Sequence, residues 1–121
     1  MEQINTQNQY ADAKIRNGNL TTLTFQENWN MKLYGKYFTT IRQASHPIKL
    51  GDTVDIVLKG KGVKLAKCIG CQIVKFSELN ELTIMMDTGF NYAESLQLFK
   101  RFGLDVHDFN LEVKYILLET I

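Results

Sequence analysis

The fold is decided by the stretch from Gly35 to Arg42, which reads Gly-Lys-Tyr-Phe-Thr-Thr-Ile-Arg. Glycine readily takes the left-handed backbone with which many helices end, so we expect a helix that closes at Gly35. The aromatic and β-branched residues that follow favour a strand, on which Phe38, Thr40 and Arg42 share one face. That face places a hydroxyl beside a guanidinium, with Lys36 behind them, and this group suits an anionic or carbonyl-bearing ligand. An ordinary strand whose arginine forms a salt bridge is the alternative.

The rest of the chain mixes strand-like and helix-like segments. Apolar residues alternate with polar ones in the expected strands and recur at helical spacing in the expected helices. Trp29 lies on the apolar stripe of the first helix and is expected in the core, whereas Asp87 falls in a polar loop at residues 87–90. This order predicts an α+β fold, a small mixed β-barrel, closed or partly closed, with flanking helices. We expect strands at residues 20–25, 37–42, 53–58, 63–76 and 109–118, and helices at residues 26–34, 77–86 and 91–102.

Two cysteines, Cys68 and Cys71, have the spacing Cys-x-x-Cys. They fall within an expected strand, where an offset of three residues places two side chains on opposite faces. His46 and His107 stand alone in the sequence, so no second pair of ligands completes a zinc site. We therefore expect two free thiols, and no metal, cofactor or redox function.

The composition is that of one ordinary domain. The 121 residues, 45% of them hydrophobic, are enough for a single core, and the net charge of +1 means that any nucleic-acid surface must be local. There is no apolar run long enough to span a membrane and no secretory signal, so we expect a cytoplasmic protein without membrane contact. Residues 1–19, rich in Asn and Gln, are expected to form a flexible polar tail before a domain at residues 20–121.

A hairpin turn is predicted at residues 59–62, which read Lys-Gly-Lys-Gly. From Ile56 to Phe76 the chain carries five lysines and no acidic residue. These lysines either contact phosphate or keep an exposed hairpin soluble, and the sequence leaves both readings open.

Four short motifs together resemble a known family: the opening stretch, then Lys49–Asp52, Leu79–Leu82 and Met86–Phe90. Their order and spacing are similar to those of the ASCH family of the PUA-like superfamily, in particular its small bacterial and phage members. The resemblance implies a small β-barrel with flanking helices. It also implies a cleft beside the Thr-Ile-Arg strand that binds RNA or a modified nucleoside, and some members hydrolyse acetylated cytidine.

The resemblance to the hydrolase-type members is incomplete. In those members a lysine stands two positions and a nucleophilic threonine five positions after the motif glycine, and a glutamate completes the set. Counted from Gly35, the threonine is Thr40, but Lys36 stands one residue early. The glutamate position holds Gly89, and the nearest acid is Asp87. Because a one-residue offset turns a strand side chain to the other face, we expect binding rather than catalysis.

Three hypotheses about function follow. The preferred one is a module that binds RNA or a nucleoside, and its binding residues would be Lys36, Thr40, Arg42, Lys59, Lys61, Lys64 and Asp87. The second is a small amidohydrolase that acts on acetylated cytidine-like nucleosides through Thr40, Lys36 and Asp87. The third is an accessory factor that binds another protein and keeps a vestigial cleft.

Overall fold

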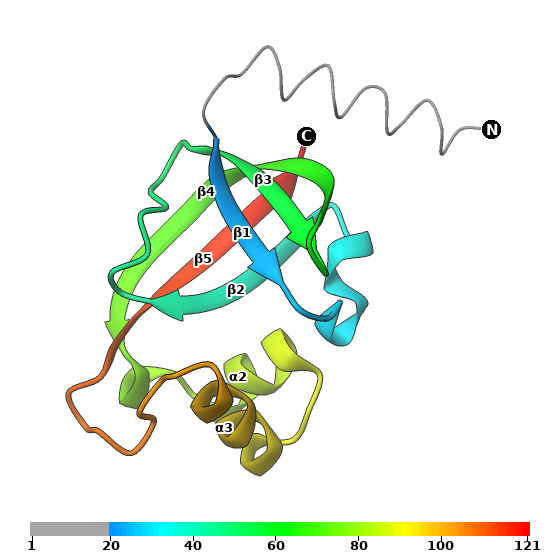
Figure 1. Ribbon diagram of the computed structural model, residues 1–121. Helices are drawn as coiled ribbons and strands as arrows, with labels where there is room; N and C mark the ends of the chain where they lie inside the picture. Colours follow the sequence, from blue (N-terminus) through cyan, green and yellow to red (C-terminus); the bar gives the residue numbers. More distant parts are fainter. Residues whose placement is uncertain (1–19) are drawn as a thin grey trace.

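The computed structural model describes residues 20–121, so the predicted tail at residues 1–19 lies outside the described residues. Five strands form one sheet in the order β1-β3-β4-β5-β2, with β1 and β3 parallel and the other neighbours antiparallel. The sheet curls into a half-barrel whose two free edges are β1 and β2 (Figure 1). This confirms the predicted mixed barrel. The strands are β1 (Thr21–Phe25), β2 (Tyr37–Gln43), β3 (Thr53–Leu58), β4 (Lys61–Lys75) and β5 (Glu112–Thr120).

Two α-helices lie at one end of the half-barrel (Figure 1). The second begins with the predicted capping box, in which Asn91 and Glu94 each accept the other's backbone N–H. Within residues 20–121 there is no helix long and apolar enough to cross a membrane. The helices are α2 (Glu81–Thr88) and α3 (Tyr92–Arg101), with short 3-10 helices η1 (Trp29–Tyr34) and η2 (Phe76–Glu78).

Strand β5 contributes to two hydrophobic clusters. Ile116 and Leu118 point into the half-barrel, where they pack with residues of β1, β3 and β4. Val113 lies on the opposite face and packs against α3 and the segments around it. Both faces of the strand therefore contribute buried residues, although Leu117 within the apolar run stays 37% exposed. Phe109, expected at the start of this strand, lies in the preceding loop and is 72% exposed.

The first helix differs from the prediction. It is a short 3-10 helix, and Gly35 after it is extended (φ −79°, ψ 156°) rather than left-handed. The left-handed residues are Asn30 and Met31, with φ of 56° and 53°. Asn30 Nδ2 donates a hydrogen bond of 2.9 Å to the carbonyl oxygen of Met86 in α2. A contact with a distant helix therefore holds this turn, and such a contact overrides local propensity.

The polar loop predicted around Asp87 is the last turn of α2. This helix starts later than expected, because Asn80 rather than Ser77 is its N-cap. It continues through Thr88 and ends at Gly89, whose φ of 79° is the left-handed helix end that glycine allows. Asp87 is consequently a buried helical residue instead of a loop residue.

The two cysteines share one face of β4, contrary to the prediction. Cys68 lies opposite Leu118 and Cys71 opposite Ile116, and both of these β5 residues point into the half-barrel. A β-bulge between Cys68 and Gly70 adds one residue to β4 and so cancels the odd offset. Both cysteines are free thiols, as predicted. Burial raises the pKa of Cys68, which disfavours the reactive thiolate.

Candidate ligand pocket

A cavity of about 800 Å³ opens between the two free edges of the half-barrel. The end of β1, strand β2 and the loop after β2 form one side, and α2, α3 and the residues after α3 form the other. The two edges approach each other here, since the guanidinium carbon of Arg42 on β2 lies 4.6 Å from the ring centroid of Phe25 on β1. The charged lining residues are Lys32, Arg42, Asp87 and Arg101.

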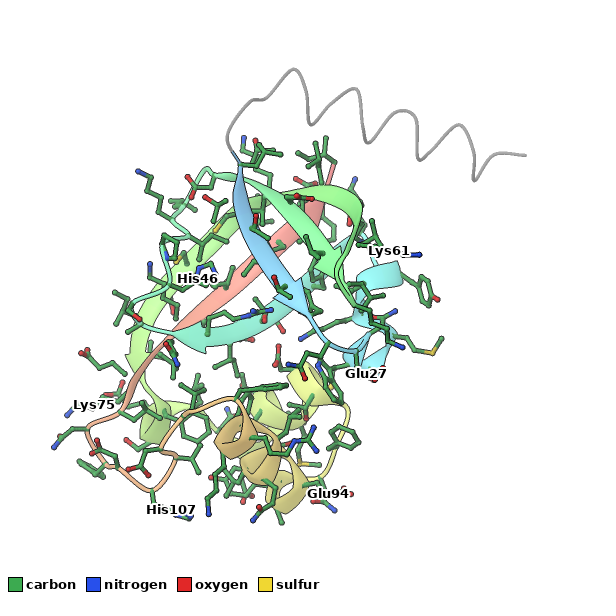
Figure 2. All side chains as sticks on the ribbon, in the orientation of Figure 1. Glu27, His46, Lys61, Lys75, Glu94 and His107 are labelled. Carbon is green, nitrogen blue, oxygen red and sulfur yellow. The ribbon has the colours of Figure 1, made fainter. Side chains whose placement is uncertain are left out.

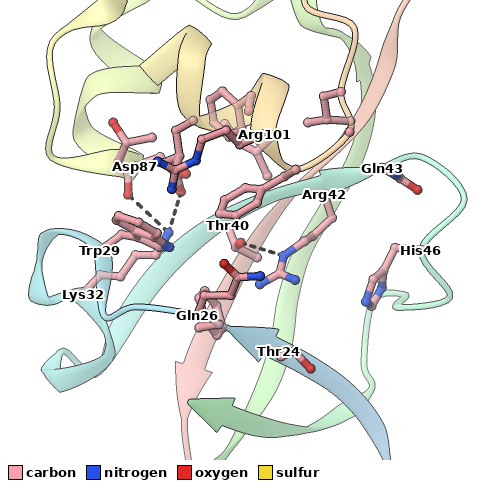
Figure 3. Close-up of a pocket in the computed structure, with 18 of the residues that line it drawn as sticks. Thr24, Gln26, Trp29, Lys32, Thr40, Arg42, Gln43, His46, Asp87 and Arg101 are labelled. Atoms are coloured by element: carbon pink, nitrogen blue, oxygen red, sulfur yellow. Dashed lines mark hydrogen bonds and ion pairs between the residues drawn. The ribbon is translucent and has the colours of Figure 1, made fainter. Parts of the chain in front are cut away.

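Lys32 and Asp87 form an ion pair in this pocket (Figure 3). Lys32 Nζ donates to Oδ1 and to the backbone oxygen of Asp87, each at 3.2 Å. Their side chains are only 10% and 5% exposed. The lysine comes from η1 and the carboxylate from α2, and the bond between Asn30 and Met86 holds these two elements together.

The carboxylate of Asp87 is also held by β2. Thr39 Oγ1 donates to Asp87 Oδ1 at 2.8 Å. Behind it, Tyr115 forms a hydrogen bond with Thr39, and burial, together with the charge of Asp87, raises the pKa of Tyr115. Oδ2 of Asp87 forms no hydrogen bond with the residues that the structure describes, so it can accept one from a ligand.

Thr40 and Arg42 line the pocket together, as the alternation of side chains along β2 predicts. Arg42 Nε donates to Thr40 Oγ1 at 3.1 Å (Figure 3). The alternative of a plain salt bridge is not realised, because Arg42 has no carboxylate within 4.0 Å in the described part of the chain. The guanidinium is fixed by a hydroxyl and an aromatic face instead.

Burial dominates the electrostatics of the two inner cations. It lowers the pKa of Lys32, an effect that Asp87 opposes and the neighbouring Arg42 reinforces. It also lowers the pKa of Arg42, to about 10, and again Asp87 opposes the shift. One carboxylate therefore serves two buried cations.

Aromatic side chains form the wall beside this polar group. Trp29 is half-buried, packs against the core of the half-barrel and lines the pocket. Its ring meets those of Phe90 and Phe102 edge to face, with centroids 5.7 and 6.2 Å away. Trp29 therefore packs against the core, as expected, but it is only half-buried and also forms a wall of the pocket.

His46 stands in the loop at the opposite side of the pocket from Lys32 (Figure 3). Its Nδ1 accepts the backbone N–H of Ile48, and the ring also bonds to the backbone of Thr22. Burial and the charges of Arg42 and Lys114 lower the pKa of His46. Since acceptance by Nδ1 requires that nitrogen to be unprotonated, we assign His46 a structural role in shaping the loop.

The structure brings together three of the residues expected at the site, namely Thr40, Arg42 and Asp87. The other four, all lysines, lie outside this pocket. The side chain of Lys36 is 66% exposed on the outer surface, and its Nζ lies 3.9 Å from Oε2 of Glu119. At the β3–β4 hairpin, Lys59 pairs with Glu27 and Lys61 points away from the molecule (Figure 2).

Lys64, the last of these lysines, has its ammonium group occupied within the protein. It donates to the backbone oxygens of Leu33 and Gly35 and to Thr120 Oγ1. These contacts tie the end of η1 to β4 and β5. Lys64 therefore has a structural role that the charge pattern of the hairpin did not reveal.

Lys32 is the main residue that the sequence reasoning missed. It stands in the predicted first helix, three residues after Trp29 on an apolar stripe. A lysine inside such a stripe could have been noticed as a buried cation. Arg101 and Gln26 also line the pocket, and neither has a pattern around it that would mark a site.

Residues 20–121 contain no group of three or more His, Cys, Asp or Glu side chains that could hold a metal ion. His46 and His107 lie on different parts of the molecule (Figure 2). The pocket lining combines hydrogen-bond donors and acceptors with aromatic side chains, a combination that suits an organic ligand.

Comparison with known proteins rests on the fold. No protein-family model matches the sequence, and no curated protein matches it significantly. Among solved structures, an ASCH domain from Lactobacillus crispatus matches with a TM-score of 0.63 and 8% sequence identity. The match covers 95% of this chain and 91% of that domain. The chain therefore has the fold of an ASCH domain, a small curled barrel, as the resemblance of its motifs predicts.

Proposed function

We propose that this protein belongs to the ASCH family and that it binds RNA or a nucleoside, with one nucleoside unit in the pocket between β1 and β2. The observation that carries the proposal is the joint presence there of Lys32, Asp87, Thr40 and Arg42 beside an aromatic wall. A base has a flat apolar face and polar edges, and this combination of groups is complementary to both.

The polar edge of a base needs a donor and an acceptor side by side. Lys32 Nζ and Asp87 Oδ2 can supply them, since neither group is fully used by its contacts within the protein. Trp29 and Phe102 supply apolar area for the face of the base. The volume of about 800 Å³ leaves room for a sugar as well.

The exposed lysines would act outside the pocket. Lys36, Lys59 and Lys61 are exposed, and they would attract the backbone of an RNA strand whose nucleoside enters the pocket. Such peripheral charges add affinity through counterion release and carry little specificity. An RNA ligand also fits the cytoplasmic location that the sequence suggests.

Two lysines four residues apart provide the matched test. Lys32→Met should weaken binding of a short single-stranded RNA at least about tenfold, because it removes a buried donor in the pocket. Lys36→Met removes the same charge from the surface, and it should weaken binding about twofold and reduce the salt dependence. Fluorescence anisotropy at several salt concentrations measures both. If the two variants lose RNA affinity equally, the proposal that the pocket binds the nucleoside is wrong.

The amidohydrolase is the second candidate, because the pocket supplies a lysine that the motif lacked. Lys32 stands beside Asp87 in the pocket that Thr40 also lines, and burial lowers its pKa, which is the direction that a lysine general base requires. In this reading Lys32, rather than Lys36, would assist attack by the Thr40 hydroxyl on an acyl carbon.

Turnover of acetylcytidine by the wild type and by Thr40→Val separates the two candidates. Valine keeps the shape of threonine and removes its hydroxyl, so a hydrolase should lose activity while a binding module should lose affinity only modestly. Wild-type turnover that disappears in the variant would replace the binding proposal with the hydrolase. If the wild type neither binds RNA or nucleosides nor turns over acetylcytidine, the protein-binding hypothesis is the one that remains.

A further inference from the structure

The pocket contains a cation, Arg42, that has no carboxylate in direct contact among the described residues. Asp87 is within 4.0 Å of Lys32 but not of Arg42, so the carboxylate directly neutralises the lysine. Arg101, the other arginine that lines the pocket, is exposed to solvent. Arg42 is only partly exposed, and the one carboxylate that acts on it, Asp87, lies more than 4.0 Å away and is shared with Lys32. A buried guanidinium without a counter-charge in direct contact is costly.

The hydrogen-bonding capacity of Arg42 is also largely unused. A guanidinium carries five N–H donors. Its Nε–H is donated to Thr40, and the Nη groups have no partner among residues 20–121. Four donors of a charged group therefore stay available in the cavity.

The position of this guanidinium is fixed. Thr40 Oγ1 holds Nε at 3.1 Å, and Phe25 lies against the face of the group with its ring centroid 4.6 Å from the central carbon. A planar fork held on one edge and one face can present its remaining edge in one direction only. Little side-chain entropy is then lost when an anion binds to that edge.

We propose that the pocket selects a phosphorylated ligand, a nucleoside monophosphate or the phosphate-bearing end of an RNA strand, and that Arg42 binds the phosphate through its Nη edge. This inference rests on the proposed function and makes it more specific. Phosphate supplies both the missing charge and two oxygens that match the fork. The Lys32–Asp87 end of the pocket is left for the base, so the ligand is a nucleotide rather than a neutral nucleoside.

Calorimetric titration with cytidine, uridine, adenosine and guanosine and with their 5′- and 3′-monophosphates tests the inference. At least one monophosphate should bind wild type about tenfold or more tightly than its parent nucleoside, as expected for one new charge-assisted pair of hydrogen bonds. Arg42→Gln keeps polar atoms but removes the charge and the fork, so it should reduce the advantage to about twofold or less.

Two control variants separate bidentate binding of the phosphate by Arg42 from nonspecific attraction by positive charge. Arg101→Gln removes an exposed charge from the rim of the same pocket, and it should retain most of the preference for phosphate. Arg42→Lys keeps the charge as a single point and should recover part of the preference, even if Arg42→Gln proves too unstable to measure. An equal loss in the Arg42→Gln and Arg101→Gln variants would overturn the assignment to Arg42.

The outcomes distinguish this inference from the proposed function. If nucleosides and their monophosphates bind wild type equally well, the inference fails and the proposed function survives. If neither nucleosides, nucleotides nor RNA bind, both fail. If a monophosphate does bind more tightly, a short RNA with and without a terminal phosphate identifies where the bound phosphate comes from. Preference for the phosphorylated strand supports an RNA end, and equal binding of both strands supports a free mononucleotide.

Discussion

Replacement of Gly89 by alanine tests how the pocket is built. Gly89 ends α2 with φ 79°, and a Cβ at this position would lie 2.8 Å from Cβ of Asn30. Asn30 belongs to the left-handed turn of η1 and donates to the carbonyl oxygen of Met86. Two segments far apart in sequence thus meet at a place that leaves no room for a methyl group, close to Lys32 and Asp87.

The expected loss of stability is the sum of three contributions. Left-handed backbone costs alanine roughly 1–2 kcal/mol, and the loss of glycine's freedom in the unfolded chain returns about 0.4–1 kcal/mol. The contact with Asn30 adds about 1–3 kcal/mol, as overpacking commonly does. Gly89→Ala should therefore lower the free energy of unfolding by about 1–4.5 kcal/mol.

Gly51 is the matched control, because its φ is 92° and a Cβ there would meet nothing within 4 Å. Gly51→Ala should cost about 0–1.5 kcal/mol, the backbone contribution alone. Urea denaturation measures both variants, and Asn30→Gly in the Gly89→Ala background should recover most of the difference. If Gly89→Ala costs no more than Gly51→Ala, the close packing of η1 on α2 is refuted, and with it the explanation of how Lys32 enters the pocket.

Three further predictions concern stability and reactivity. Lys64→Met should lower the free energy of unfolding by about 1–3 kcal/mol, because the carbonyl oxygen of buried Leu33 loses its donor whereas that of Gly35 keeps Thr120 Oγ1. Lys61→Met at the exposed hairpin should change it by less than about 0.5 kcal/mol, and similar values for the two variants in urea denaturation would contradict the structural role of Lys64. The pKa of His46 is lowered in the folded protein, so the unfolded chain binds a proton on this ring more readily and stability should be lost as the pH falls below about 6.5. Denaturation at about pH 7.5 and 5.5 should show a smaller loss of stability for His46→Gln than for wild type, and an equal loss would contradict this role of His46. A thiol reagent should modify native Cys71 well before the fully buried Cys68, and simultaneous labelling would show that the bulged strand opens readily.

Much of the fold was readable from local patterns. Alternation of apolar residues predicted the strands, and Asn91 with Glu94 predicted the start of α3, because each of these signals involves neighbours within one turn or one strand. The same short-range logic placed Thr40 and Arg42 on one face. Motif order added Asp87, although its local sequence indicated a loop rather than the end of a helix.

The remaining features depend on contacts between segments far apart in the chain. Lys32 takes the place expected of Lys36 because Asn30 bonds to a helix 56 residues later, and no local pattern records that contact. Cys68 and Cys71 share a face because a bulge in β4 shifts its register against β5. The bulge is a feature of the pairing of these two strands. Alternation and capping are properties of a short segment, so they were legible in the sequence. The arrangement of cations and carboxylate in the pocket arose only when the curled sheet and its helices packed together, because the partners of a buried charge are chosen by tertiary contact.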